Sequence, residues 1–382
     1  MKRAIVGLML ICAAPAFADA SPASRYGDDL LRAIPAIVQK LPGYVEVAEA
    51  VAPLLVKGGS LWLAGDKGFI LEGLGRAGGL MMVKQLAQPQ DAKSGDVVLY
   101  GTFATPSAEQ QKAVEVLRAR GVMVVGMTPT RVESRDWLFE LERSKAPGTD
   151  PTLAAPLLTA SHWVLTGEIV AALTRLGKMP PLWQSVMVPG GRDRNAPHLK
   201  LQWEPGEWQP VKAGLLGREF LATIANNLRS LKLTQAQQMA AVGQMAAETR
   251  QQGHTVWYAS LGHLPPELPG LPGDPQAAKP LLAPAAKLGE SVQPGDLILY
   301  VGYYEPYDDY VQRAHEAGAK IVTVVSGTPE KPATAMGAEL NIDGCWDYGD
   351  AAVGVPGYDI RFLPPSGFIS AAAYYMLMAE VK

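Results

Sequence analysis

The chain has 382 residues, of which 48% are hydrophobic and 19% charged, so it holds enough apolar material for packed cores and is not intrinsically disordered. Its 34 basic and 37 acidic residues give a formal net charge of −3, which argues against nucleic acid or an anionic membrane as the main partner. At roughly 100–200 residues per domain, the length predicts two domains.

Residues 1–20 have the three parts of a secretory signal peptide: a basic start at Lys2 and Arg3, a short apolar run, and small residues suited to cleavage. The run is short for a membrane anchor, and Ile11 before Cys12 disfavours a lipoprotein. We therefore expect a periplasmic or secreted protein with no membrane segment in its mature form. Cleavage leaves Cys345 as the only cysteine, which excludes an intramolecular disulfide.

The next part of the chain predicts a helical lead followed by a βαβ unit. The expected elements are helices over 29–41 and 44–56, strands over 60–64 and 80–83 with a short helix from Phe69 between them, a strand over 97–100, a loop over 101–107, a helix over 108–120 and a strand over 122–127. A strand, loop, helix and strand of this length form a crossover between parallel strands, so we expect a parallel sheet covered by helices.

The same unit returns 200 residues later, with a strand over 297–300, a helix to about 317 and a strand over 319–325. Seven residues match at this constant offset: Gly95/Gly295, Asp96/Asp296, Leu99/Leu299, Tyr100/Tyr300, Pro106/Pro306, Thr128/Thr328 and Pro129/Pro329. The chain is therefore predicted to be a tandem duplication, in which the strand over 254–259 is the counterpart of 60–64.

Helices are expected between the repeats over 157–176, 214–231 and 234–252, and at the end of the chain over 367–378. A Trp-, Pro- and Gly-rich insertion over 180–211 interrupts them, and its tryptophans favour an ordered structure. The predicted organisation is a signal peptide over 1–20, a first domain over 21–232 that contains the insertion, and a second domain over 233–382.

Two units of this kind, each entered through Gly-Asp before the strand, resemble the sugar isomerase (SIS) domain. The segment over 338–376, with Asn341-Ile342-Asp343, Gly349-Asp350-Ala351 and Pro365-Ser366-Gly367, is similar to the closing segment of uncharacterised sugar isomerase-like proteins. The resemblance implies two flavodoxin-like α/β domains, each a parallel sheet flanked by helices, in an exported branch of the family. It also implies a small-molecule sugar or sugar derivative as ligand, and it is compatible with a homo-oligomer.

Both loops that follow the repeated strands depart from the family pattern, which is a Ser- and Thr-rich loop that cradles a sugar phosphate. The first loop keeps Thr102, Thr105 and Ser107 but lacks the dense Ser-x-Ser-Gly-x-Thr form. The second loop, over 303–309, carries three acidic residues, which repel a phosphate. We therefore expect the second loop to have lost phosphosugar binding and leave the first loop open.

Ligands of parallel sheets bind outside the carboxyl ends of the strands, at a switch in strand order. The candidate ligand-binding residues are Gly65, Asp66, Lys67, Thr102, Thr105, Ser107, Arg192 and Ser366. Lys67 is the only cation in the two loops of the first repeat and would meet an anionic group, although an ordinary surface lysine is the favoured alternative. Arg192 could clamp a carboxylate or phosphate or be solvated, and Ser366 could cap the last helix or contact ligand.

Other motifs give weaker signals. The run Gly73–Gly78 fits the dinucleotide fingerprint but follows a helix, so a tight turn is favoured. The histidines lack metal-ligand spacing, which predicts no metal or cofactor, and His162 is only a weak candidate for a catalytic base. Asp343, Asp347 and Asp350 lie near Trp346 and Tyr348, as acidic and aromatic groups do around unphosphorylated sugars, or form an acidic surface loop.

The leading interpretation is an exported SIS-like protein that binds a sugar or sugar derivative, with degenerate isomerase activity or none. One alternative is an active periplasmic sugar or sugar-phosphate isomerase, which needs a base beside the substrate. Another is a two-lobed solute-binding protein, although two complete halves in series do not favour it. A structural or interaction module remains a further alternative.

Overall fold

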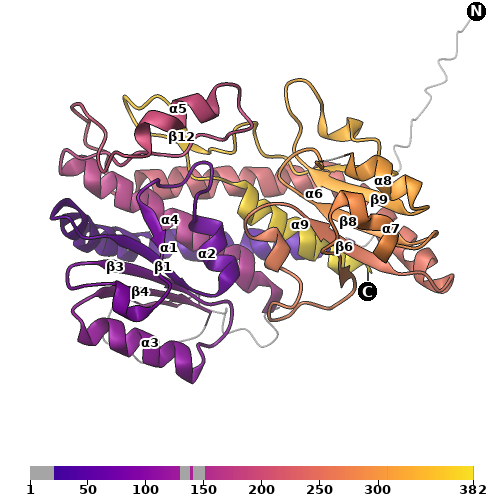
Figure 1. The fold of residues 1–382 in the computed structure, drawn as a ribbon, viewed down its shortest axis with the longest axis horizontal. Helices are drawn as coiled ribbons and strands as arrows, with labels where there is room; N and C mark the ends of the chain where they lie inside the picture. The colour runs from indigo at the N-terminus through magenta and orange to yellow at the C-terminus, as the bar shows by residue number, and fades with distance from the viewer. Residues whose placement is uncertain (1–20, 130–137, 141–150, 308, 382) are drawn as a thin grey trace, which may run out of the picture.

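The computed structural model describes residues 21–129, 138–140, 151–307 and 309–381. The predicted signal peptide and Asp308 lie outside the described residues. These residues form two five-stranded parallel sheets and a small antiparallel pair (Figure 1). The first sheet has the order β2-β1-β3-β4-β5 and the second β10-β9-β8-β6-β7, so the switch in strand order falls between β1 and β3 and between β6 and β8.

The strands of the first sheet are β1 Leu61–Gly65, β2 Val83–Gln85, β3 Val97–Gly101, β4 Met123–Thr128 and β5 Leu138–Glu140. Those of the second sheet are β6 Val256–Ser260, β7 Lys279–Pro280, β8 Leu297–Val301, β9 Lys320–Val325 and β10 Leu340–Asp343. The antiparallel pair is β11 Val353–Gly354 with β12 Arg361–Phe362. Every residue of β3 and β8 is buried. Their continuous apolar sequence is what a parallel strand covered on both faces requires.

Four long helices form a layer shared by the two sheets: α1 Pro22–Val56, α4 Ala154–Arg175, α6 Leu215–Gln251 and α9 Ser366–Val381. One hydrophobic core joins this layer to the inner faces of both sheets. Helix α3 (Ala108–Ala119) covers the outer face of the first sheet, and α7 (Leu288–Ser291) and α8 (Tyr310–Glu316) cover that of the second (Figure 1). Below, the first lobe is β1–β5 with α3, and the second lobe is β6–β10 with α7 and α8.

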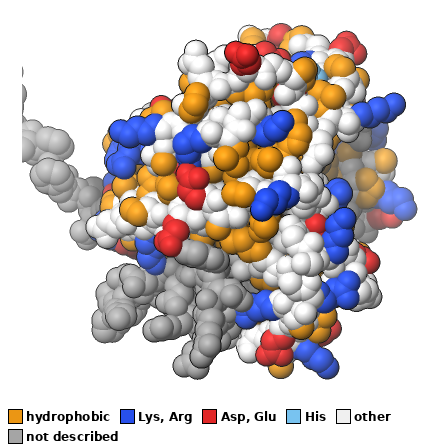
Figure 2. All heavy atoms as spheres, turned by 90° about the vertical axis from the view of Figure 1, so that its left-hand side faces the viewer, with side chains coloured by type: hydrophobic (Ala, Val, Ile, Leu, Met, Phe, Trp, Pro, Cys, Tyr) orange, Lys and Arg blue, Asp and Glu red, His pale blue; other side chains and the backbone are white. Residues whose placement is uncertain are grey.

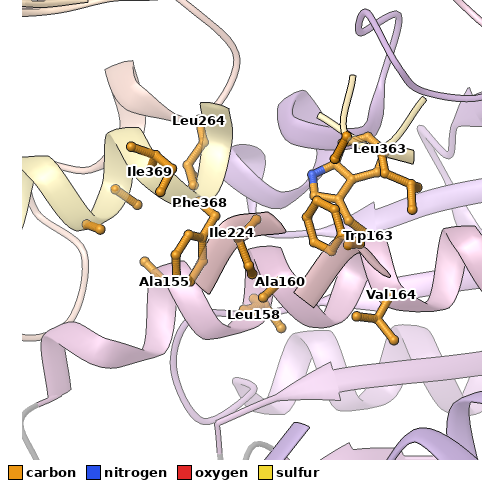
Figure 3. Packing of buried hydrophobic residues seen from close by; sticks show 14 of the residues in the cluster. Ala155, Leu158, Ala160, Trp163, Val164, Ile224, Leu264, Leu363, Phe368 and Ile369 are labelled. Atoms are coloured by element: carbon orange, nitrogen blue, oxygen red, sulfur yellow. The ribbon is translucent and has the colours of Figure 1, made fainter. Parts of the chain in front are cut away.

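Helix α9 packs deep inside this shared layer. Figure 3 shows Phe368 and Ile369 of α9 lying beside α4, which contributes Leu158, and beside Leu264 of the second lobe. Helix α4, from Pro151 to Arg175 with its preceding turn, is long and apolar enough to cross a membrane, but 94% of its most apolar window is buried inside the protein. Its apolarity is therefore that of a core helix packed on all sides.

The predicted α/β fold class with paired parallel sheets is confirmed, and three element predictions are corrected. The helices expected over 29–41 and 44–56 are one helix, α1, because its buried stripe runs unbroken past Pro42 from Leu41 to Tyr44. Those expected over 214–231 and 234–252 are also one helix, α6, so the domain boundary predicted at 232 lies within a helix. The strand expected over 80–83 forms at 83–85, because Leu80 bridges to Leu182 instead.

The duplication extends to individual hydrogen bonds. The carboxylate of Asp96 accepts hydrogen bonds from the backbone N–H groups of Ser60 and Lys93 and from the indole of Trp62, at 2.8–3.0 Å. In the second lobe, Asp296 accepts the same three bonds, from Thr255, Gln293 and Trp257. Burial opposes ionisation of both aspartates, but these hydrogen bonds outweigh it and lower the pKa of each.

Lys and Arg side chains are scattered singly among hydrophobic and acidic groups on the end of the molecule seen in Figure 2. A nucleic-acid surface instead gathers its cations in a continuous stripe. This face therefore gives no support to a nucleic-acid partner.

Candidate functional site

At the carboxyl ends of the strands in the first lobe, the side chain of Asp66 binds the neighbouring loop. Asp66, directly after β1, accepts a hydrogen bond from the backbone N–H of Phe103 at 2.7 Å and one from the side-chain amide of Gln110 at 2.9 Å. These donors belong to the loop after β3 and the first turn of α3, the loop whose phosphate binding the sequence left open. The carboxylate of Asp66 therefore supplies the negative charge that this loop and helix N-terminus favour.

The other residues predicted on this edge have local partners. Gly65 has φ +105°, and a Cβ there would lie 2.0 Å from the carbonyl oxygen of Gly101, so the two strands approach too closely for a side chain. The hydroxyl of Thr102 is buried and donates to the carbonyl of Ala104. Ser107 caps α3 in a reciprocal capping box with Gln110, and Thr105 is exposed.

Lys67 pairs with Glu267 of the second lobe at 2.7 Å, with its side chain 72% exposed. This contact joins α2 (Lys67–Gly73) to the short 3-10 turn η3 (Pro265–Glu267), two segments that follow the first strand of each repeat. The carboxyl edges of the two lobes therefore meet at this point.

The remaining candidates lie apart from that edge. Arg192 is exposed on α5 (Gly191–His198) in the insertion. His162 is buried in α4 against Phe69 and Trp163, and its Nδ1 has no hydrogen-bond partner among the described residues. Burial and the nearby charge of Arg76 lower the pKa of His162 to about 3.

Ser366 belongs to a buried charged network that the sequence did not reveal. Arg76 pairs with Glu72 at 2.6 Å and with Asp350 at 3.3 Å, and it also donates to the hydroxyl of Ser366, which itself donates to Asp350 at 2.7 Å. The indole of Trp163 donates to Glu72 at 2.9 Å. Burial raises the pKa of both carboxyl groups, whereas Arg76 lowers it.

The network ties the first lobe to the segment after β10 and to α9. Gly367 is needed beside it, because a Cβ there would lie 1.9 Å from a carboxylate oxygen of Glu72. Asp350 itself has φ +50°, a strained conformation that its three hydrogen bonds hold in place. Asp350 is thus part of this internal joint and not of an acidic surface loop.

The insertion contacts the loop after β8 in the second lobe. Tyr303 donates to the hydroxyl of Ser185 at 3.3 Å, and Tyr307 donates to the sulfur of Met187 at 3.1 Å. The hydroxyl of Tyr348 donates to the carbonyl of Met187. The insertion is therefore ordered, as predicted, and it lies against the loop that corresponds to the loop after β3 in the first lobe.

Beside this loop, a pocket of about 330 Å³ opens at the carboxyl ends of β6 and β8, where the strand order switches. Its lining comes from the ends of the two strands, the proline-rich segments on either side of β7, and the start of α8. The lining residues are Tyr258, Ala259, Ser260, Leu261, Pro266, Pro269, Pro280, Leu281, Leu282, Ala283, Pro284, Ala285, Tyr300, Tyr307 and Tyr310.

Tyrosines supply much of the polarity of this pocket. The hydroxyl of Tyr310 is buried and has no hydrogen-bond partner among the described residues, and burial raises its pKa to about 12. The ring of Tyr300 lies 5.4 Å from that of Tyr310, and its pKa is also raised by burial. Aromatic faces with hydroxyls at their edges suit a ligand that has both apolar and hydroxyl-bearing faces.

The candidate residues predicted from the sequence lie outside this pocket, because they were charged, hydroxyl-bearing or turn residues of the first repeat, the insertion and the start of α9. Its signal in the sequence is the density of prolines between 265 and 284 together with the five tyrosines from 300 to 310. Each proline fixes its own backbone φ, which limits how far these segments can rearrange around the pocket.

A comparison with protein-family models gave no match, and neither did a sequence comparison with curated proteins. Solved structures of similar fold include a protein from Salmonella typhimurium LT2, provisionally named as a sugar-binding protein, at TM-score 0.51 and 10% identity, covering 94% of this chain and 98% of that one. The likeness to this structure confirms the overall fold.

Two further similar structures have lower scores. Tagatose-6-phosphate ketose/aldose isomerase from Escherichia coli has TM-score 0.48 and 10% identity, covering 96% of this chain and 93% of its own. The C-terminal domain of glucosamine-fructose-6-phosphate aminotransferase from Francisella tularensis has TM-score 0.46 and 9% identity, covering 91% and 96%.

Proposed function

We propose that this protein binds an unphosphorylated sugar or sugar derivative in the pocket of the second lobe, and that it has no efficient isomerase activity. The observation that carries the proposal is the pocket itself, which lies at the switch in strand order and is lined by tyrosines. Stacking on Tyr300 or Tyr310 would bury the apolar face of a sugar, and a shift of the Tyr310 side chain would bring its buried hydroxyl within reach of one of the sugar hydroxyls.

A ligand without phosphate is supported by both lobes. In the first lobe, Asp66 already occupies the donors of Phe103 and Gln110, so a phosphate there would meet a carboxylate. In the second lobe, the loop after β8 carries Glu305 and Asp309 and gives a phosphate no cation of its own.

The lowered pKa and the enclosed position of His162, the candidate base, support weak isomerase activity. Isomerisation requires a base that removes a proton beside the carbonyl carbon, and efficient bases have a pKa near the working pH. A pKa of about 3 makes His162 a poor base, and its ring is enclosed by Phe69 and Trp163.

We also propose export to the periplasm or the medium, supported by the tripartite sequence of residues 1–20. N-terminal sequencing of the protein purified from its native host tests this. A start at Asp19 or Ser21 is expected, and an intact Met1 on cytoplasmic material would contradict export.

Calorimetry with glucose, galactose and N-acetylglucosamine, and with their 6-phosphates, tests the binding proposal. We expect at least one free sugar to bind more tightly than its phosphate, and Tyr300→Phe or Tyr310→Phe to weaken that binding about 5- to 10-fold through loss of a hydrogen bond. The matched control is Tyr100→Phe, at the duplicated position in the first lobe, which should change nothing. Equal loss in the control, or binding of phosphates alone, would refute the proposal, and a product assay on bound sugars tests for isomerisation.

A further inference from the structure

The pocket at the carboxyl ends of β6 and β8 is electrically neutral. Among the residues that the structure describes, none that lines it is charged. The hydroxyl of Tyr258 donates to the carbonyl of Pro265 at 3.0 Å, so it is already engaged in the wall. A charged ligand would lose its hydration on entry without gaining an ionic partner, which is costly.

The mouth of the pocket is apolar. Leu282 is 87% exposed, the largest exposed fraction among the large hydrophobic residues that the structure describes, and the exposed residues Pro280 and Pro284 flank it. An exposed leucine between two prolines presents a rigid apolar rim, which would stabilise an apolar group on a ligand that extends outward from the tyrosines.

The lining also bears on the chemical form of the sugar. Its side-chain polar groups are the hydroxyls of Ser260 and the four tyrosines, and burial raises the pKa of the hydroxyls of Tyr258, Tyr300 and Tyr310. Such groups form hydrogen bonds but do not move protons at neutral pH. Isomerisation requires the open-chain sugar, which has a free carbonyl, and a group that moves protons beside it. The lining of this pocket offers no such group, so nothing in it favours the open-chain form.

We infer that the ligand is an uncharged glycoside whose sugar ring stacks on the tyrosines and whose apolar aglycone lies against Leu282 and its flanking prolines. This inference rests on the proposed function, because it takes the same pocket and specifies the class of sugar derivative. A glycoside has its anomeric carbon blocked, so binding it is consistent with the weak isomerase activity proposed above.

Calorimetry on the full mature chain tests this inference with matched methyl and phenyl β-glycosides of glucose, galactose and N-acetylglucosamine, with phenol and the free sugars as reference probes. We expect the phenyl glycoside of at least one sugar to bind about tenfold more tightly than its methyl counterpart, because the ring loses its exposure to water. Leu282→Ser should reduce that preference to about threefold or less. Leu233→Ser, at a leucine 79% exposed on α6, is the control and should preserve the preference.

The outcomes separate the inference from the proposed function. Equal affinity for methyl and phenyl glycosides would overturn the inference and leave sugar binding in place, as would a preference that Leu282→Ser does not change. Binding of phenol with no contribution from the sugar would overturn both, because the pocket would then be a site for aromatic ligands. Failure of every glycoside and free sugar to bind would remove the proposed function and the inference with it.

Discussion

The two lobes share the same order of strands, but the carboxyl ends of their strands carry different side chains: one edge is closed and the other opens into a pocket. In the first lobe, the carboxylate of Asp66 is bound to the loop after β3, and Ser107 caps α3, so the edge satisfies its own donors. In the second lobe, the corresponding edge opens into a neutral pocket walled by tyrosines and prolines. The duplicated strands place a switch in strand order in each lobe, whereas a few side chains determine whether that edge is closed or open and whether its lining is charged.

The joint between the lobes gives the largest expected effect. Arg76→Met leaves the carboxylates of Glu72 and Asp350 buried without their cation, and we expect the free energy of unfolding to fall by about 3–5 kcal/mol in urea denaturation. Adding Glu72→Gln and Asp350→Asn should recover part of the loss. The control is Arg192→Met on exposed α5, which should stay within about 0.5 kcal/mol. A loss below about 1 kcal/mol for Arg76→Met would show that the network does not hold the lobes together.

The duplicated aspartates offer a direct comparison of the lobes. Asp96→Asn and Asp296→Asn each remove a charge that three donors stabilise, and each should cost about 1.5–3 kcal/mol. Because the pKa of both aspartates is lowered, their contribution is present above the unfolded pKa near 3.8 and is lost as pH falls through the folded value. Urea denaturation at pH 7 and pH 3 checks this: the two variants should resemble one another, and their cost should shrink in acid.

Variants of Asp66 test whether its carboxylate occupies an anion-binding position in the first lobe. Asp66→Ala frees the N–H of Phe103 and should lower stability by about 1–2 kcal/mol, near the lower end of the usual range because the residue is half-buried. Inorganic phosphate should then raise the melting temperature of the variant and leave the wild type unchanged. Asp66→Asn, which keeps an acceptor oxygen, should respond less to phosphate. Equal responses of wild type and Asp66→Ala would mean that the carboxylate does not occupy an anion site.

The smallest expected effect concerns buried histidines. The pKa of His162 is lowered to about 3 and that of His263 to about 4, mainly by burial, so the unfolded chain binds protons that the folded protein does not. Stability is therefore lost as pH falls below the unfolded value of about 6.5. Between pH 7.5 and 5.5, the wild type should lose about 1–1.5 kcal/mol more than His162→Gln does. Parallel pH profiles of the two proteins would show that His162 becomes protonated in the folded state.

Sequence patterns alone predicted much of the fold because the relevant physics is local. Apolar runs such as Val97–Gly101 and Leu297–Val301 match strands buried on both faces, and the helix predicted over 108–120 is α3. The offset of 200 residues identified the duplication. The helix boundary predicted near Pro42 was wrong. Pro42 costs the helix one backbone hydrogen bond, but burial of the apolar residues around it stabilises the helix by more than that.

The candidate site was less accessible from sequence because its partners lie far apart along the chain. Asp66, Lys67 and Ser366 were identified from sequence, but their partners Phe103, Glu267 and Arg76 lie up to 290 residues away. Composition, spacing and repeats determined that this protein is a paired α/β fold with a switch in strand order in each sheet. Only the tertiary structure decided which position is closed by Asp66 and which opens among the tyrosines, because a pocket is the space left between distant segments, and no single segment encodes it.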